Sequence, residues 1–164
     1  MKKHWLTSLA VAAVVAMASA NASAGDVLAA VTADRIHYLA KGASVYISWM
    51  KTPLFKHSGG PLIATYTAEC AVAAYPLVPG GAKVGVSIAV TDAEGKQVAS
   101  MSPAPEAFCS SSGETDLRSA SKATHAVTSV ATLPAGVYRV QVLGHVNDPT
   151  AVAAMGARSL VVSR

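Results

Sequence analysis

Three residues in or next to a serine-rich segment could together perform nucleophilic catalysis. Ser111 would attack, His125 would act as general base, and Asp116 would orient the imidazole ring. The sequence lacks the Gly-x-Ser-x-Gly elbow that exposes such a serine, and residues 102–124 have the composition of a polar loop. A solvated loop explains these residues more simply, so no catalytic residue is predicted, and an enzyme of unrecognised type is kept as an alternative.

Histidine and methionine offer a second chemistry, the binding of copper. Met50 and His57 flank one short segment and His37 lies upstream, so a fold that gathered the three side chains would form a soft metal site. No two histidines have the H-x-H or H-E-x-x-H spacing of metal centres. Ordinary loop or surface positions are favoured, so neither a metal site nor a cofactor is predicted. A periplasmic copper-binding protein is the second alternative.

Acidic residues occur in two close pairs, Asp92 with Glu94 and Glu114 with Asp116. Paired carboxylates catalyse glycoside hydrolysis when they face each other across a cleft. Both pairs lie in segments with turn or loop composition, so we interpret them as solvated charges.

The cysteines Cys70 and Cys109 are the only two in the chain. Two cysteines allow one intramolecular pairing, and their spacing is far from the C-x-x-C of redox pairs. We therefore expect one structural disulfide. Closing a loop of about 40 residues would stabilise the fold by roughly 4 kcal/mol in the chain-entropy model.

Large apolar residues gather where a predicted strand ends and its loop begins. Trp49 lies near the strand end, and Leu54 and Phe55 follow Pro53. Loops at the end of a β-sandwich are common binding surfaces. These three residues are the candidate interaction surface, and a protein or an envelope component is the expected partner. For Trp49 itself a core position is favoured, whereas Leu54 and Phe55 fit core and surface equally.

The N-terminus has the organisation of a secretory signal peptide. Two lysines precede an apolar run at residues 6–17, and residues 22–24 fit the small-x-small pattern of a signal peptidase site, with residues 18–20 as a second candidate. The run is shorter than the ~20 residues that a transmembrane helix needs. We expect residues 1–24 to be removed and residues 25–164 to form one periplasmic or secreted domain without a transmembrane span.

The net charge of the exported chain excludes nucleic acid as a partner. Removal of the two signal-peptide lysines lowers the formal charge from +4 to +2, because 11 basic residues then face 9 acidic ones. The basic residues are scattered singly along the chain. Proteins that bind nucleic acid concentrate lysine and arginine on one face.

Turn residues divide the chain after residue 25 into about seven short segments of β character, which is typical of a β-sandwich. Residues 84–91 alternate strictly, and Asp92-Ala93-Glu94-Gly95 predicts a hairpin turn after them. Ser58-Gly59-Gly60-Pro61 predicts another turn. Residues 26–41 fit either a helix or a strand, and the extended form is favoured because a strand-like segment follows. The other predicted strands are residues 45–50, 62–75, 96–101, 127–130, 140–142 and 160–162.

Residues Leu133 to Tyr138 form the pattern L-x-x-G-x-Y. This pattern resembles the corner of many immunoglobulin-like and fibronectin-like sandwiches, in which the tyrosine hydroxyl bonds back to nearby backbone. The chain departs from true immunoglobulin domains at Val140, where those domains have cysteine. The resemblance implies an all-β fold, a small immunoglobulin-like or fibronectin-like β-sandwich with one disulfide.

These features predict an exported, non-enzymatic β-sandwich protein of the bacterial envelope or secreted fraction. Its expected role is that of a binding or structural accessory module. Fold class alone does not identify a ligand, because sandwiches have many unrelated functions.

Overall fold

The computed structural model describes residues 25–40, 45–76, 81–111 and 113–164, and the regular elements within them are all β-strands. The predicted signal peptide, residues 1–24, lies outside the described residues. Among the described residues there is no helix with the length and apolar character needed to cross a membrane. The strands are β1 (Val27–Ala33), β2 (His37–Ala40), β3 (Val45–Lys51), β4 (Phe55–Ala74), β5 (Lys83–Asp92), β6 (Gln97–Ser100), β7 (Cys109–Ser110), β8 (Ala123–Val146) and β9 (Ala151–Ser163).

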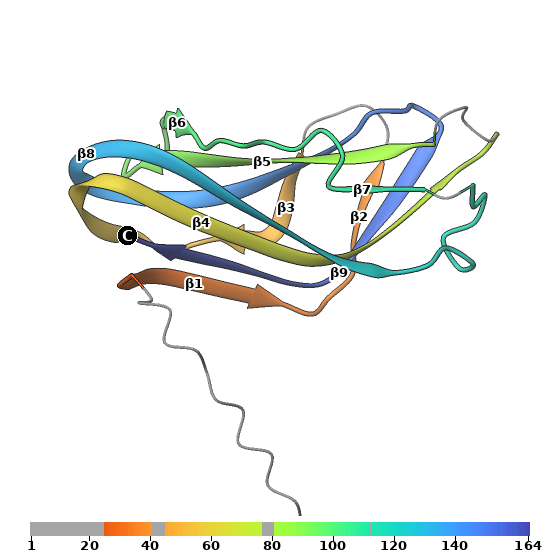
Figure 1. Cartoon of the computed structure of the whole chain (residues 1–164), viewed down its shortest axis with the longest axis horizontal. Helices are drawn as coiled ribbons and strands as arrows, with labels where there is room; N and C mark the ends of the chain where they lie inside the picture. The colour runs from red at the N-terminus through yellow and green to blue at the C-terminus, as the bar shows by residue number, and fades with distance from the viewer. Residues whose placement is uncertain (1–24, 41–44, 77–80, 112) are drawn as a thin grey trace, which may run out of the picture.

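The strands form two packed layers that share the long strands β4 and β8. All pairings are antiparallel, in the order β1-β9-β4-β8-β5-β6, with β2 on β9, β3 on β8 and β7 on β5. One layer holds β1, β2, β9, most of β4 and the first half of β8, and the other holds the second half of β8 with β3, β5 and β6. Figure 1 shows β4 and β8 turning together at the end of the molecule drawn on the left. The all-β sandwich with one disulfide is therefore confirmed.

The turn predicted at residues 58–61 is corrected to a bend inside β4. Gly59 and Gly60 have φ values of 94° and 102°, which L side chains rarely adopt, so the backbone curves sharply there. Pairing with β8 nevertheless continues on both sides of the bend, from Phe55 opposite Tyr138 to Cys70 opposite Ala123. A strand that bends in this way can pass from one layer of a sandwich to the other.

The L-x-x-G-x-Y segment forms the matching bend of β8. Tyr138 Oη donates a hydrogen bond to the Pro134 carbonyl oxygen at 3.1 Å, as the resemblance to sandwich corners implied. A Cβ at Gly136 would lie only 2.7 Å from that hydroxyl, so the tyrosine ring needs glycine at this position. The corner therefore depends on both residues of the pattern.

Replacing Tyr138 by phenylalanine should lower the free energy of unfolding by about 1 kcal/mol, because one partly buried hydrogen bond is lost and the ring remains. Urea unfolding of the two proteins measures this difference. Tyr75→Phe is the matched control, since Tyr75 is 76% exposed. An equal loss in both variants would contradict a specific role of the Tyr138 hydroxyl.

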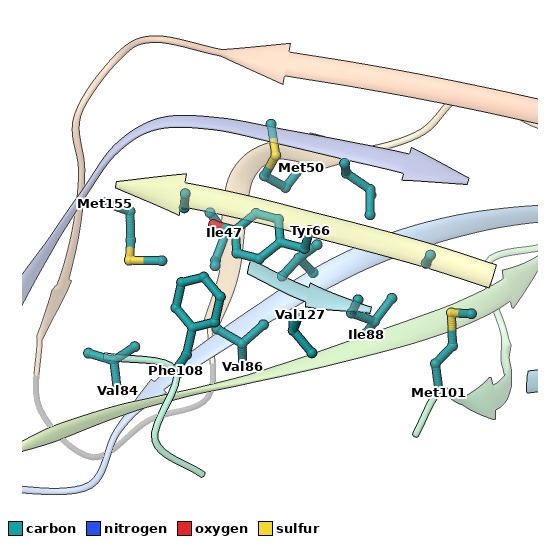
Figure 2. Close-up of a cluster of buried hydrophobic side chains, with 14 of the residues drawn as sticks. Ile47, Met50, Tyr66, Val84, Val86, Ile88, Met101, Phe108, Val127 and Met155 are labelled. Carbon is teal, nitrogen blue, oxygen red and sulfur yellow. The ribbon is translucent and has the colours of Figure 1, made fainter. Parts of the chain in front are cut away.

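Other local predictions hold. Residues 26–40 form the strands β1 and β2 with a bend between them and no helix, and Asp92 caps the β5–β6 hairpin by accepting a hydrogen bond from Lys96 N at 2.8 Å. The long loop after β6 is attached to β4 through the Cys70–Cys109 disulfide. Between the layers, Tyr66 lies with its ring centroid 5.5 Å from that of Phe108, among branched residues of β5 (Figure 2). The largest side chains with at most 1% exposure are Leu39, Met50, Leu62, Tyr66, Val84, Val86, Ile88, Val90, Met101, Val140, Met155 and Leu160.

Candidate functional site

The backbone of β3 is irregular around Trp49. Tyr46 pairs with Leu143 and Lys51 with Gln141, so the four residues between Tyr46 and Lys51 face one residue of β8. Such extra residues form a β-bulge, which bends the strand and turns side chains in new directions. We call residues 46–51 the Trp49 bulge.

Trp49 has φ 66°, and among the described residues it is the one non-glycine residue with positive φ. A bulky residue in this region is a genuine outlier and costs of the order of 1–3 kcal/mol. The bulge also separates its side chains. Ile47 and Met50 are buried in the core, whereas Tyr46 and Trp49 are 57% and 69% exposed. The favoured core position of Trp49 is therefore wrong, because the bulge breaks the alternation on which it depended.

The side chain of Arg158, in β9, is hydrogen-bonded to the backbone of the Trp49 bulge. Its side chain is buried, and its Nη2 donates to the carbonyl oxygen of Ser48 at 3.0 Å, one residue before Trp49. Its Nη1 donates to the Arg35 carbonyl oxygen at 2.6 Å, in the turn between β1 and β2, and to two carbonyl oxygens of β9. One guanidinium therefore fixes the bulge and the neighbouring turn relative to each other.

The charge of Arg158 is stabilised by these carbonyl dipoles. The ion pair found among the described residues joins Arg164 to Asp26 and does not involve Arg158. Burial lowers the pKa of Arg158, and nearby Tyr66 and Asp34 act in the opposite direction. Because arginine titrates so far above neutral pH, the guanidinium stays charged.

His37 adds a second link between β2 and the bulge. Its Nδ1 lies 3.0 Å from the Ser48 hydroxyl oxygen, within hydrogen-bond distance. Burial, and secondly the charge of Arg158, lower the pKa of His37 below its ordinary value. The ring is therefore neutral at pH 7 and adds no second positive charge beside Arg158.

Trp49 contributes to the lining of two open depressions. The first, which we call the Gln141 depression, has a volume of about 390 Å³ and is lined by the Trp49 bulge, Thr91, Gly95 and Gln141. The second, the Asp34 depression, has a volume of about 300 Å³ and is lined by residues 32–35 and Trp49. A third depression, with a volume of about 610 Å³, shares Thr32, Ala33 and Asp34 with it and is also lined by Thr67 and residues 157–159.

Polar side chains in the Gln141 depression are available to a ligand. Thr91 of β5 and Gln141 of β8 are buried, at 3% and 7% exposure. In the described residues, no hydrogen bond joins the side chain of Thr91 or Gln141 to another protein group, and neither is among the fully buried polar atoms that lack a partner. Their hydroxyl and amide groups therefore reach the surface of the depression, where they can bind an incoming polar molecule. Lys51 adds a positive charge at the same depression.

The three residues predicted as an interaction surface do not lie together. Phe55 begins β4 opposite Tyr138 and is 8% exposed, so it belongs to the core, and its place on a surface is corrected. Leu54 is 43% exposed but is not among the residues that line either depression. Trp49 is the member of the set that lies at the candidate site.

The three residues considered for copper binding each have a different structural environment. Met50 is fully buried in the core, and the buried His57 donates from Nε2 to the Gly60 carbonyl oxygen at 3.3 Å. His37 contacts Ser48, as described above. In the residues that the structure describes, no three His, Cys, Asp or Glu side chains are grouped as a metal site would require.

The residues considered for nucleophilic catalysis have separate structural contacts. The Ser111 hydroxyl accepts from Ala82 N at 3.0 Å, and Asp116 Oδ1 accepts from Arg118 N at 2.9 Å. The His125 ring lies 5.5 Å from that of Phe108. No hydrogen bond joins the three within the described ranges, so the structure does not bring them together as a triad.

Comparison with known proteins gives no family. No family model matches the chain, and no curated protein is a significant match. One similar solved structure is that of infectious bursal disease virus, Gx strain, with 12% identity and TM-score 0.47 over 85% of this chain and 32% of that one. The chain thus spans about a third of that viral protein.

Two bacterial modules are also similar. The CBM22-1 xylan-binding domain of Paenibacillus barcinonensis Xyn10C has 11% identity and TM-score 0.36 over 86% of this chain and 97% of that domain. The carbohydrate-binding module CBM6cm-2 of Cellvibrio mixtus lichenase 5A, in complex with cellotriose, has 14% identity and TM-score 0.30 over 85% and 98% of the respective chains. None of these similarities assigns an activity to the present chain.

Proposed function

We propose that this protein is an exported, non-enzymatic binding module of the bacterial envelope or secreted fraction, and that it binds its ligand at the Trp49 bulge. The observation that carries the proposal is Trp49 itself. The residue is 69% exposed on a backbone with positive φ, and a buried arginine donates a hydrogen bond to the carbonyl oxygen of the residue before it. A buried indole would stabilise the fold, whereas an exposed indole on strained backbone does not, so stability does not explain this arrangement. Strain of this kind clusters at functional sites.

Export is supported by two features. The first 24 residues have the order of a signal peptide, with two lysines, an apolar run and small residues. The disulfide between Cys70 and Cys109 suits an oxidising compartment, because reducing systems keep cytosolic thiols free.

The chemistry of the site favours a carbohydrate as ligand. Exposed Trp49 and Tyr46 offer flat apolar rings, and Gln141 and Thr91 offer an amide and a hydroxyl in the lining of the depression. A sugar ring has an apolar C–H face that packs on an aromatic ring, and hydroxyl groups at its rim that form hydrogen bonds. A protein partner would instead require an apolar interface core much larger than one or two rings. The proposed ligand is therefore a glycan.

Replacing Trp49 by alanine should abolish binding while the fold persists, because an exposed side chain on strained backbone contributes little to stability. The protein is purified from the exported fraction of its host and its mass is checked for loss of residues 1–24. Trp49 is then the single tryptophan, since the other is Trp5. Its fluorescence is titrated with hexasaccharides of xylose, glucose and N-acetylglucosamine, and calorimetry compares the variants.

The expected result is a saturable change in wild-type fluorescence and at least a tenfold loss of affinity in Trp49→Ala. Leu54→Ala is the matched control, because Leu54 is exposed outside both depressions. If Leu54→Ala loses binding and Trp49→Ala keeps it, the binding surface is elsewhere. If no glycan binds with a Kd below about 1 mM, a weak affinity by any standard, the glycan is the wrong ligand class.

A further inference from the structure

We infer that the ligand crosses Trp49 and continues on both sides of it, so that the site binds an internal stretch of a polysaccharide chain. This inference rests on the proposed function and extends it. Its basis is that Trp49 lines both the Gln141 depression and the Asp34 depression. A site for a chain end would have one depression closed at the aromatic residue, whereas here Trp49 contributes to the lining of two open ones.

The size of the depressions fits sugar units on either side of the indole. Their volumes of about 390 Å³ and 300 Å³ lie at the lower end of the range in which proteins bind small molecules. One unit stacked on Trp49 and one in each depression give a minimum ligand of three units. Shorter oligosaccharides would leave at least one depression empty.

Each depression has its own polar groups for such a unit. Gln141, Thr91 and Lys51 line the first. Asp34, Arg35 and Thr32 line the second, and all three are exposed. Hydroxyl groups of a sugar both donate and accept hydrogen bonds, so amide, carboxylate and guanidinium groups all suit them. Both ends of the site therefore contain the chemistry that a sugar requires.

The two depressions are also held at a fixed spacing by one side chain. Arg158 donates to the Ser48 carbonyl oxygen in the bulge at 3.0 Å and to the Arg35 carbonyl oxygen in the Asp34 depression at 2.6 Å. A ligand that spans both sides thus meets a preorganised surface. Little conformational entropy is lost on binding, which favours affinity for the longer chain.

Calorimetry with an oligosaccharide series of one to six units tests this inference, using the sugar that wild type binds best among the three hexasaccharides. We expect affinity to rise at least tenfold from one to three units and then to level off. Asp34→Ala, on one side of Trp49, and Thr91→Val or Gln141→Leu, on the other, should each weaken binding of the hexasaccharide about fivefold to tenfold. Thr91→Val keeps the shape of the side chain, so it still tests this side of the site if the Gln141→Leu variant does not fold.

The outcomes separate this inference from the proposed function. If a monosaccharide binds as tightly as the hexasaccharide, or if variants on one side alone weaken binding, the ligand ends at Trp49 and the inference is wrong while the proposed function stands. If Trp49→Ala binds the hexasaccharide as wild type does, the proposed site itself is wrong. If no oligosaccharide binds wild type, the ligand is not a glycan and the inference is overturned with that ligand class.

Discussion

Replacing both Cys70 and Cys109 by alanine lowers the free energy of unfolding by about 4 kcal/mol and the melting temperature by roughly 10 °C. The disulfide closes a loop with a sequence separation of 39 residues, and its Cα atoms are 6.3 Å apart, within the usual range. Without it, the unfolded chain gains the conformational freedom that the cross-link removes. The core is built largely of valine and alanine, so few other interactions replace that contribution.

The folded state of this variant should also change in a defined place. The loop that carries Cys109 is attached to the start of β5 by backbone hydrogen bonds, from Phe108 N to the Val84 carbonyl oxygen at 2.6 Å and from Ser111 N to that of Ala82 at 2.8 Å. Amide hydrogen exchange should accelerate at these donors before it does in the centre of β5. Urea unfolding measures the stability, and the single variant Ser110→Ala is the control. A loss below 1 kcal/mol would show that the disulfide is not a major stabiliser.

Replacing Arg158 by methionine should lower the free energy of unfolding by about 3 kcal/mol. It should also weaken binding of the ligand. Methionine keeps an apolar stem of similar length but leaves the carbonyl oxygens of Arg35 and Ser48 without their donor. A buried polar group without a partner costs about 1–3 kcal/mol, and water that enters the site recovers part of this loss. Because the backbone at Trp49 is strained, the bulge relaxes once its anchor is removed.

A readout at Trp49 distinguishes this positioning role from a general loss of stability. The fluorescence anisotropy of Trp49 should fall in Arg158→Met at temperatures where the fold is still intact. The anisotropy of Arg158→Lys should lie between those of wild type and Arg158→Met, because one ammonium group cannot reach two carbonyl oxygens in the geometry of the guanidinium fork. Arg118→Met is the control, since Arg118 is exposed in the long loop. Unchanged anisotropy together with reduced stability would show that Arg158 does not position Trp49.

Local patterns predict the strands of this fold well where side chains decide the structure. The alternation in residues 84–91 predicts β5, and Val84, Val86, Ile88 and Val90 are indeed buried in the core. The same logic fails at Gly59 and Gly60, because glycine marks a sharp bend but does not say whether strand pairing stops there. Pairing with β8 decides that question, and it involves residues more than 70 positions away.

The candidate site was less predictable for a physical reason. Strict alternation places Trp49 on the same face as Ile47, so sequence alone predicts a core position. The bulge that reverses this is hydrogen-bonded to Arg158, whose partners are backbone carbonyl groups, and every residue has a carbonyl group. Gln141 and Thr91 give no signal in the sequence either, because no spacing or motif connects two single polar residues on separate strands.

The two bent strands have a consequence for how the molecule folds. Since β4 and β8 run through both layers, neither layer can form its hydrogen bonds fully without ordering part of the other. The outermost pairing, Val27 opposite Ser163, joins residues that are 136 positions apart in the chain. Chains dominated by such distant pairings fold in milliseconds to seconds rather than microseconds. Because β4 and β8 are shared by both layers, we expect the two layers to fold together in one cooperative step, and this step to be slow.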